Sequence, residues 1–328
     1  MKPANIIETT ALTKSYHGIP AVNGISLQVP EGSVYGFLGP NGAGKSTAMK
    51  LLLGLAQKDS GSIRLFGEEL TPSSRISILK QTGSLIESPS YYGNLTGYEN
   101  LQITCMLKGL PESEILRVLK MVRMDGQKNK KASRYSLGMK QRLAIANALL
   151  GSPRLLLLDE PTNGLDPAGI HEMRELIRNL PKTAGMTVLI SSHLLSEMEQ
   201  MADHIGILSR GSLVFQGPLS ALQAKAERRL IIRTGDDRQV LELFSGGNNL
   251  RLPGETDLGL TNEENPGPAV SPPPSLTEKG LAFPPLSDRE AGQLIARLVN
   301  MGIPVYRVQE EAQNLETIYL DMVKEAGL

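Results

Sequence analysis

The chain has 328 residues with 34 basic and 34 acidic side chains, and this balance argues against a nucleic-acid partner. Its single cysteine excludes an intrachain disulfide and fits a reducing cytosol. No apolar run reaches the ~18 residues of a membrane-spanning helix, and polar residues interrupt the first ten positions, so neither a membrane span nor a signal peptide is expected. We therefore expect a cytoplasmic protein that meets a membrane only through a partner.

Strands and helices are expected to alternate through the first two thirds of the chain. Residues 5–38 contain β-rich runs separated by turn residues, and a helix follows the glycine-rich segment 39–47. Residues 96–124 predict two helices broken by the sequence GLP at 109–111. Helices and apolar strands then continue to alternate as far as residue 217, which indicates a doubly wound α/β core.

The composition changes near residue 225, so we expect a first domain at 1–225 and a C-terminal accessory region at 226–328. Within that region, six glycines and eight prolines make residues 245–287 a predicted flexible linker. Strand and helix patterns flank the linker, including a helix with Ser287 as N-cap and Glu290 three residues later. These patterns predict a small α+β region.

The segment GPNGAGKST matches the G-x-x-x-x-G-K-[ST] pattern between a predicted strand and a predicted helix. Its glycines let backbone N–H groups face phosphate oxygens, and the helix N-terminus adds a positive dipole. Lys45 should reach the β- and γ-phosphates, and Ser46 should bind Mg²⁺. The predicted nucleotide-binding loop consists of Gly39, Pro40, Asn41, Gly42, Ala43, Gly44, Lys45, Ser46 and Thr47.

Two carboxylates, Asp159 and Glu160, end the apolar run LLLLDE. A buried strand of this kind places them at the carboxyl edge of the sheet, beside the phosphate loop. Asp159 would then hold Mg²⁺ through water, and Glu160 would polarise the attacking water. A solvent-exposed acidic strand end is the alternative.

Four further residues are candidate nucleotide contacts. Ser136 and Gly138 open a predicted helix and could present a hydroxyl and bare N–H groups to a phosphate, although an ordinary N-cap is the alternative. One chain cannot easily bring both the glycine-rich loop and this second helix start to one phosphate. The pattern therefore hints at a dimer with ATP between the subunits. His193 follows an apolar strand and is expected near the γ-phosphate, although a lone histidine is usually structural. Tyr16 could stack on adenine.

The order of Tyr16, GPNGAGKST, SLGMK, LLLLDEP, NGLDP and His193 resembles the ATP-binding cassette of ABC transporters. The resemblance covers about residues 4–220. It implies an α/β P-loop NTPase core with an antiparallel β subdomain and a helical signature subdomain at about residues 88–150.

The same resemblance implies a role for each matching residue. Tyr16 stacks on adenine, and His193 contacts the γ-phosphate. Ser136 and Gly138 belong to a signature loop that touches the γ-phosphate across a dimer. Asp166 sits in the loop that links the two nucleotide sites.

Two motifs depart from the usual cassette. The LSGGQ signature reads YSLGM here, so Leu137 replaces the first glycine and Met139 replaces the glutamine. Glu87 stands where the loop after the next strand usually has glutamine. Both departures, and the sequence NLETIYLDMVKE near the end, are similar to the bacitracin-resistance and lantibiotic-immunity ATPase subunits. Glu87 would bind Mg²⁺ or the lytic water, unless it is a solvated loop carboxylate.

The favoured hypothesis is an ATPase subunit, using ATP and Mg²⁺, that dimerises with a second copy and powers a separate ABC-2 type membrane permease. It would lie at the inner face of the cell membrane and drive export of antimicrobial peptides, without nucleic acid. One alternative is an ABC ATPase of translation or DNA repair, but no sustained heptads separate Thr47 from Ser136. The other is a nucleotide-dependent sensor without turnover, against which Glu160 argues.

Overall fold

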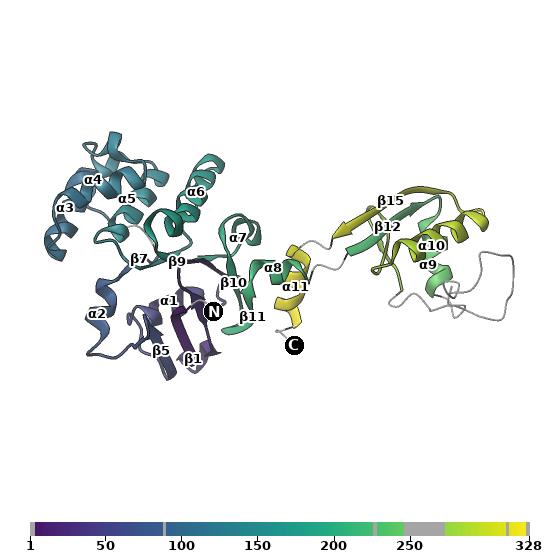
Figure 1. Cartoon of the computed structure of the whole chain (residues 1–328), viewed down its shortest axis with the longest axis horizontal. Helices are drawn as coiled ribbons and strands as arrows, with labels where there is room; N and C mark the ends of the chain where they lie inside the picture. The colour runs from purple at the N-terminus through teal and green to yellow at the C-terminus, as the bar shows by residue number, and fades with distance from the viewer. Residues whose placement is uncertain (1–3, 88–89, 226–227, 246–272, 313–314, 326–328) are drawn as a thin grey trace. The chain divides into compact units, whose positions relative to one another are not determined.

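The computed structural model describes residues 4–87, 90–225, 228–245, 273–312 and 315–325 (Figure 1). The chain divides into two compact units, Met1–Ala221 with Tyr319–Leu328, and Leu222–Ile318. Among the described helices, none is both long and apolar enough to cross a membrane.

The first unit is built around a six-stranded sheet with the order β11-β10-β4-β9-β8-β7. All neighbouring strands are parallel except β10 and β11, which are antiparallel. Every residue of β4, β8 and β9 is buried, as expected for parallel strands that are covered on both faces. The strands are β4 (Val34–Leu38), β7 (Thr82–Leu85), β8 (Leu155–Asp159), β9 (Thr187–Ser192), β10 (His204–Ser209) and β11 (Ser212–Pro218).

A second, antiparallel sheet lies against the helix that follows β4. Helix α1 (Lys45–Leu52) shares one apolar core with both sheets, in which Met49 and Leu52 pack with Ile7 and Phe37. The α/β core and the antiparallel β subdomain are therefore as predicted. The antiparallel strands are β1 (Asn5–Tyr16), β2 (Ile19–Ile25), β3 (Gln28–Pro30), β5 (Ser60–Leu65) and β6 (Glu68–Glu69), and α2 (Arg75–Lys80) precedes β7.

Three helices form the predicted helical subdomain and lie together beside β7 (Figure 1). They are α3 (Gly97–Lys108), α4 (Ser113–Met121) and α5 (Leu137–Leu149), with 3₁₀ turns at Asp125–Gln127 and Ala132–Arg134. A capping box of Thr96 and Glu99 begins α3, and Gly109 in a left-handed conformation ends it. These local signals explain why the sequence divides into two helices here, as expected.

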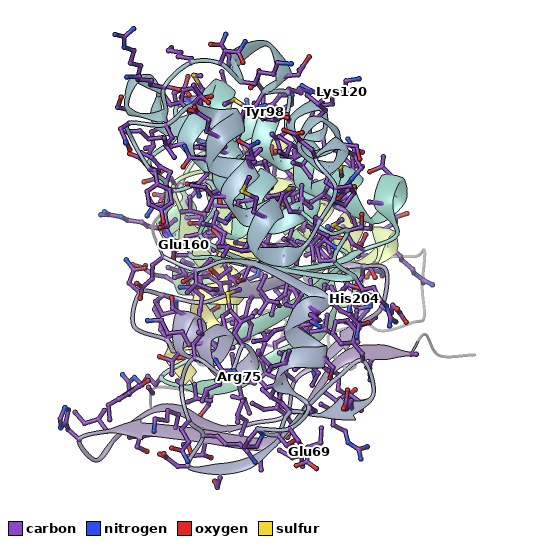
Figure 2. The ribbon with its side chains drawn as sticks, turned by 90° about the vertical axis from the view of Figure 1, so that its left-hand side faces the viewer. Glu69, Arg75, Tyr98, Lys120, Glu160 and His204 are labelled. Atoms are coloured by element: carbon purple, nitrogen blue, oxygen red, sulfur yellow. The ribbon has the colours of Figure 1, made fainter. Side chains whose placement is uncertain are left out.

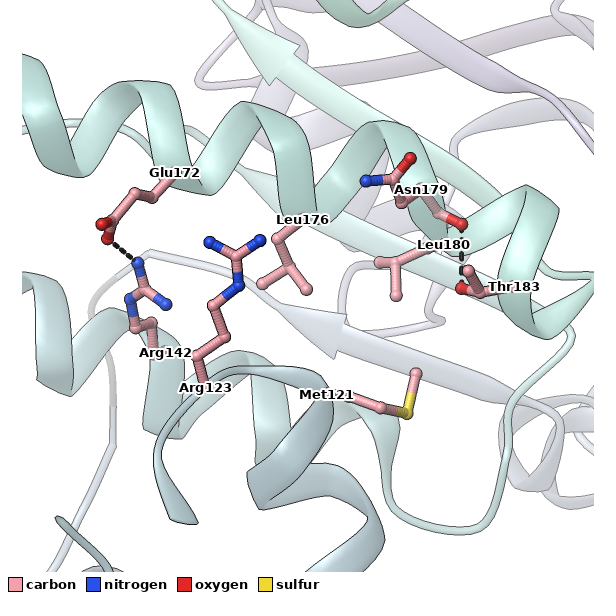
Figure 3. Close-up of a pocket in the computed structure, with 8 residues that line it drawn as sticks. All are labelled: Met121, Arg123, Arg142, Glu172, Leu176, Asn179, Leu180 and Thr183. Atoms are coloured by element: carbon pink, nitrogen blue, oxygen red, sulfur yellow. Dashed lines mark hydrogen bonds and ion pairs between the residues drawn. The ribbon is translucent and has the colours of Figure 1, made fainter. Parts of the chain in front are cut away.

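A small cavity of about 230 Å³ separates the helical subdomain from helix α6 (Pro167–Ala184). Figure 3 shows Arg142 of α5 pointing toward Glu172 of α6, with which it forms an ion pair. Nearby, Nη2 of Arg123 lies 3.4 Å from the carboxylate of Glu175. Charged pairs therefore span the boundary between the helical subdomain and the core.

The second unit is a small α+β fold with the element order β-α-β-β-α-β, the ferredoxin-like arrangement. Its four strands are all antiparallel in the order β13-β14-β12-β15. Leu230 and Ile232 of β12 pack with Phe244 and Leu294 from the two helices. The elements are β12 (Arg228–Thr234), α9 (Asp237–Ser245), β13 (Ser275–Thr277), β14 (Gly280–Phe283), α10 (Asp288–Asn300) and β15 (Val305–Ala312).

The predicted linker extends too far along the chain, because residues 275–283 form the β13–β14 hairpin. Leu281 and Phe283 of that hairpin are fully buried in the core of the second unit. The flanking prolines and glycines masked these two short strands in the sequence. Residues 246–272 of the predicted linker lie outside the described residues.

The capped helix after the hairpin is confirmed, since Ser287 and Glu290 form the expected capping box at the start of α10. Three further helices lie in the described residues, the first of which is α7 (Leu195–Met201). The other two are α8 (Leu219–Gln223) and α11 (Leu315–Glu325).

Candidate functional site

The glycine-rich loop joins the carboxyl end of β4 to the first turn of α1. Its backbone comes close to neighbouring strands. A Cβ atom at Gly39 would lie 2.5 Å from the carbonyl oxygen of Leu208, and one at Gly44 would lie 2.1 Å from that of Ala21. Gly44 also has a φ of +102°, which side chains rarely tolerate. Only glycine fits these two positions, so the close packing of the loop before the N-terminus of α1 depends on them.

Lys45 is held inside the curve of this loop and is only 5% exposed. Its Nζ donates hydrogen bonds to the carbonyl oxygens of Gly39 at 2.7 Å and Pro40 at 3.1 Å. The same Nζ lies 3.6 Å from Oε1 of Glu160. Burial lowers the pKa of Lys45, and the charge of Glu160 opposes that shift. A partly desolvated cation held this way is suited to contact phosphate.

Asp159 and Glu160 stand at the end of β8 and are fixed by a serine of the neighbouring strand. Ser191 Oγ donates to Asp159 Oδ1 at 2.6 Å and accepts from the Glu160 backbone N–H at 2.9 Å. Glu160 Oε2 lies 3.4 Å from Nδ1 of His193. The strand ends thus bring together Glu160, His193 and Lys45, as the sequence predicted from their positions alone.

Glu160 has the left-handed backbone angle φ = +46°, which is rare for a residue with a side chain. Figure 2 shows Glu160 between the helical subdomain, marked by Tyr98 and Lys120, and the region of Glu69 in β6 and Arg75 in α2. Strained backbone of this kind persists only where the surrounding structure holds it, and it is concentrated at functional sites.

A polar pocket of about 450 Å³ opens beside these residues. It brings together the three predicted metal ligands, Ser46, Asp159 and Glu87. Its lining residues are Ser46, Glu87, Leu137, Gln141, Asp159, Glu160 and Asn163. A hydroxyl and carboxylates are the hard oxygen donors that Mg²⁺ prefers. The described residues contain no group of three or more histidine, cysteine or acidic side chains placed to hold a metal. Ser46, Asp159 and Glu87 are therefore the side chains of this pocket that could hold a metal ion.

The sequence interpretation did not single out Gln141 or Asn163. Gln141 is buried, and it lies four residues after Leu137, so both side chains share one face of α5. That helical spacing was the available signal for Gln141. Asn163 lies three residues after Glu160, in the loop that precedes α6.

The other candidate residues do not line this pocket. Tyr16 is 45% exposed at the end of β1, with Lys14 Nζ 5.3 Å from its ring centroid. Ser136 caps α5 by accepting from the Met139 N–H at 3.3 Å, and Asp166 caps α6 by accepting from the Gly169 N–H at 3.3 Å. Within one chain, these three residues therefore lie outside the pocket that Glu160 lines.

Gly138 lies in the first turn of α5 and leaves room beside the loop before α6. A Cβ atom at this position would lie 3.7 Å from Cδ2 of Leu165, which is ordinary contact. A methyl group at Gly138 would therefore meet the loop that leads to Asp166 in ordinary contact.

A glycine loop that folds around a buried lysine beside a strand-end carboxylate pair defines a nucleotide-binding domain of the P-loop class. A model of the ABC transporter family matches residues 22–163. The bacitracin transport ATP-binding protein BcrA of Enterococcus faecalis is 49% identical over 324 residues, 98% of this chain and 98% of its own length. The lantibiotic transport ATP-binding protein SrtF of Streptococcus pyogenes is 47% identical over 205 residues, 62% of this chain and 87% of its own length.

Solved structures give the same assignment. The cbiO1 protein of Clostridium perfringens, part of the cbiONQ ABC transporter complex, matches with a TM-score of 0.63 and 26% identity over 75% of this chain and 96% of its own. A dimeric ATP-binding cassette in a post-hydrolysis state with ADP and phosphate matches with a TM-score of 0.59 and 25% identity over 65% of this chain and 98% of its own. The chain belongs to the ABC transporter family, and its first unit is an ATP-binding cassette with ATPase activity.

Proposed function

We propose that this ATPase powers a separate ABC-2 type permease that exports peptide antibiotics of the bacitracin or lantibiotic type, and so protects the cell from them. The observation that carries the proposal is the 49% identity with the BcrA protein of Enterococcus faecalis along 98% of both chains. Identity over that length includes the second unit as well as the cassette. We infer that residues 226–328 are an accessory region specific to this kind of transporter.

The phosphate loop and Lys45 bind the phosphates of ATP, because the loop holds a buried cation at the N-terminus of α1. Ser46 and Asp159 would hold Mg²⁺, which neutralises phosphate charge when bound. Glu160 orients and polarises the attacking water. His193, 3.4 Å from Glu160, contacts the γ-phosphate. Tyr16 is exposed at the end of β1 and stacks on adenine.

The chain acts as a homodimer at the inner face of the cell membrane. Ser136, Gly138 and Asp166 support this arrangement because they lie at the starts of α5 and α6 and do not line the pocket beside Lys45. In the dimer, the Ser136 hydroxyl and the Gly138 backbone N–H would donate to a nucleotide held by a second copy, and Asp166 would link the two sites. Removal of the γ-phosphate by hydrolysis then loosens the interface, and that change drives the permease.

Tolerance of living cells tests the proposal. Cells carrying this chain with its permease should tolerate bacitracin or a lantibiotic better than cells carrying the permease alone, and the Glu160→Gln variant should abolish that gain. The Glu69→Ala variant changes an exposed carboxylate in β6 and is the matched control. Equal sensitivity of all these strains to both antibiotics would contradict the proposed substrate class.

A further inference from the structure

We propose that Glu197 is a positioning residue for ATP hydrolysis. Its buried carboxylate ties the chain after Glu160 to the chain before His193. The inference rests on the proposed roles of Glu160 and His193 in the cassette. Glu197 lies on the short helix α7 (Leu195–Met201), is 3% exposed and does not line the pocket at Glu160. Its action must therefore pass through other residues.

The Glu197 carboxylate contacts three different segments of the chain. Its Oε2 accepts hydrogen bonds from Thr162 Oγ1 at 2.8 Å and from Ser192 Oγ at 3.0 Å. Its Oε1 lies 3.8 Å from Nη2 of Arg174 on α6. A buried carboxylate is unfavourable unless donors and a positive charge compensate it. These three partners meet that need, so the carboxylate draws their segments together.

The first of these segments fixes Glu160 from the C-terminal side. Thr162 follows Glu160 by two residues, with only Pro161 between them. On the other side, the Glu160 N–H donates to Ser191 Oγ at 2.9 Å. Glu160 adopts a left-handed φ of +46°, which a residue with a side chain keeps only when its surroundings hold it. The bond to Ser191 restrains Glu160 on its N-terminal side, and the bond from Thr162 to Glu197 restrains it on its C-terminal side.

The second segment fixes His193. Ser192 immediately precedes it, and Ser192 Oγ donates to Glu197 while accepting from the backbone N–H of Leu194 at 3.0 Å. A hydroxyl has one donor and two acceptor sites, so both bonds form together. The two bonds therefore restrain the chain on each side of His193. One carboxylate thus sets the spacing of the two side chains that we assign to hydrolysis, Glu160 for the attacking water and His193 for the γ-phosphate.

A purely structural role is the competing explanation. Arg174 Nη1 donates to Gln200 Oε1 at 2.6 Å, so Glu197 and Arg174 could serve only to fasten α7 to α6. That role predicts a loss of stability without a selective loss of turnover. The hydroxyl of Thr162 separates the two explanations, because it contacts Glu197 without taking part in the α6–α7 contacts of Arg174.

The decisive variant is Thr162→Val, which keeps the shape of the side chain and removes the hydroxyl. In the purified full-length chain, we expect kcat for ATP to fall by roughly 10-fold or more, while the Kd for ATP changes by less than about 3-fold. The loss should be confined to kcat because Lys45 and the phosphate loop are untouched. Thr162→Ser keeps the hydroxyl and should restore kcat, and Glu199→Gln, on an exposed residue of the same helix, should leave it unchanged.

A second measurement tests whether Thr162 acts through Glu160. In a Glu160→Gln background, Thr162→Val should cause no further loss of hydrolysis. Wild-type kcat in Thr162→Val, or equal losses of kcat and ATP affinity with a matching fall in melting temperature, would overturn the positioning role and leave the cassette assignment intact. Wild-type hydrolysis in Glu160→Gln itself is a different result, and it would contradict the proposed role of Glu160 together with this inference.

Discussion

Nζ of Lys50 lies 2.5 Å from Oε1 of Glu87, so an ion pair joins α1 to the chain just after β7. The hydrogen bond to Glu87 raises the pKa of Lys50. Both side chains are partly exposed, and such pairs add little to stability. The pair matters because α1 begins at the phosphate loop, so the contact with Lys50 fixes Glu87 relative to that loop. Glu87 also has a left-handed φ of +63°. Glu87 therefore lines the nucleotide-site pocket while it is paired with α1.

The Glu87→Ala variant should impair antibiotic tolerance much more than ATP binding. The substitution removes an oxygen ligand from the pocket but leaves Lys45 and the phosphate loop in place. Glu87→Gln keeps one side-chain oxygen and should retain part of both the antibiotic tolerance and the ATP binding. The measurement pairs the ATPase rate of the purified transporter with the tolerance of cells carrying each variant. Full tolerance in Glu87→Ala cells would mean that Glu87 is a bystander.

The Lys45→Ala variant should lose nucleotide binding, because it removes the buried cation on which the loop carbonyls of Gly39 and Pro40 converge. Calorimetry with ATP is the direct measurement. Lys80→Ala is the matched control, since it removes an exposed lysine in the last turn of α2, outside the phosphate loop. An affinity for ATP in Lys45→Ala close to that of the unaltered chain would contradict the assigned site.

The nucleotide site was largely predictable because its signals are local. The glycine pattern before α1 and the acidic pair after an apolar strand each specify a turn or a strand end. Rules for parallel sheets then place both at one edge. Caps such as Ser287 with Glu290 are equally local, and the structure has them as expected.

Contacts between segments far apart in the chain were not predictable in this way. Glu197 meets Thr162 across 35 positions of sequence, and no periodic pattern marks that pair. The β13–β14 hairpin was missed because its strands are only three and four residues long and stand between prolines. Its burial depends on β12, which pairs with β14 from more than forty residues away.

The Glu160→Gln variant should keep ATP binding, lose most hydrolysis and trap a dimer when ATP and Mg²⁺ are present. An amide keeps the shape of the side chain but cannot polarise water as a carboxylate does. Size-exclusion chromatography with ATP should show the dimer, and the same sample with ADP should show less of it. Unchanged hydrolysis with only monomers in ATP would contradict the proposed role.

The second unit should lose stability when its core is opened without a change in ATP hydrolysis. Phe244 is 6% exposed, and its ring lies 5.3 Å from that of Phe283 in an edge-to-face arrangement. Phe244→Ala should reduce the free energy of unfolding of this unit by about 3–5 kcal/mol. Urea unfolding measures the change, and Val299→Ala, at a 55% exposed residue, is the control. Equal unfolding midpoints for the two variants would show that Phe244 is not a core residue.

Leu137, which departs from the usual signature, contacts the loop that leads to Asp166. It is 48% exposed and lines the pocket beside Glu160. Its Cδ2 lies 2.9 Å from the position that a Cβ atom would take at Gly164, a residue with a φ of +75°. Leu137 therefore covers Gly164, and the contact links the start of α5 to the loop before α6 within one chain.

A Gly164→Ala variant should be destabilised for two separable reasons, its left-handed backbone and its clash with Leu137. In a Leu137→Gly background the clash disappears and only the backbone strain remains, so the same substitution should cost less there. We expect the two costs to differ by about 1 kcal/mol, typical of residues in direct contact. Urea unfolding of the unaltered chain, the two single variants and the double variant measures this coupling. Leu137→Gly is present in both chains of the second comparison, so the cost of placing a glycine in α5 cancels. Equal costs of Gly164→Ala in both backgrounds would show that Leu137 does not restrain the loop.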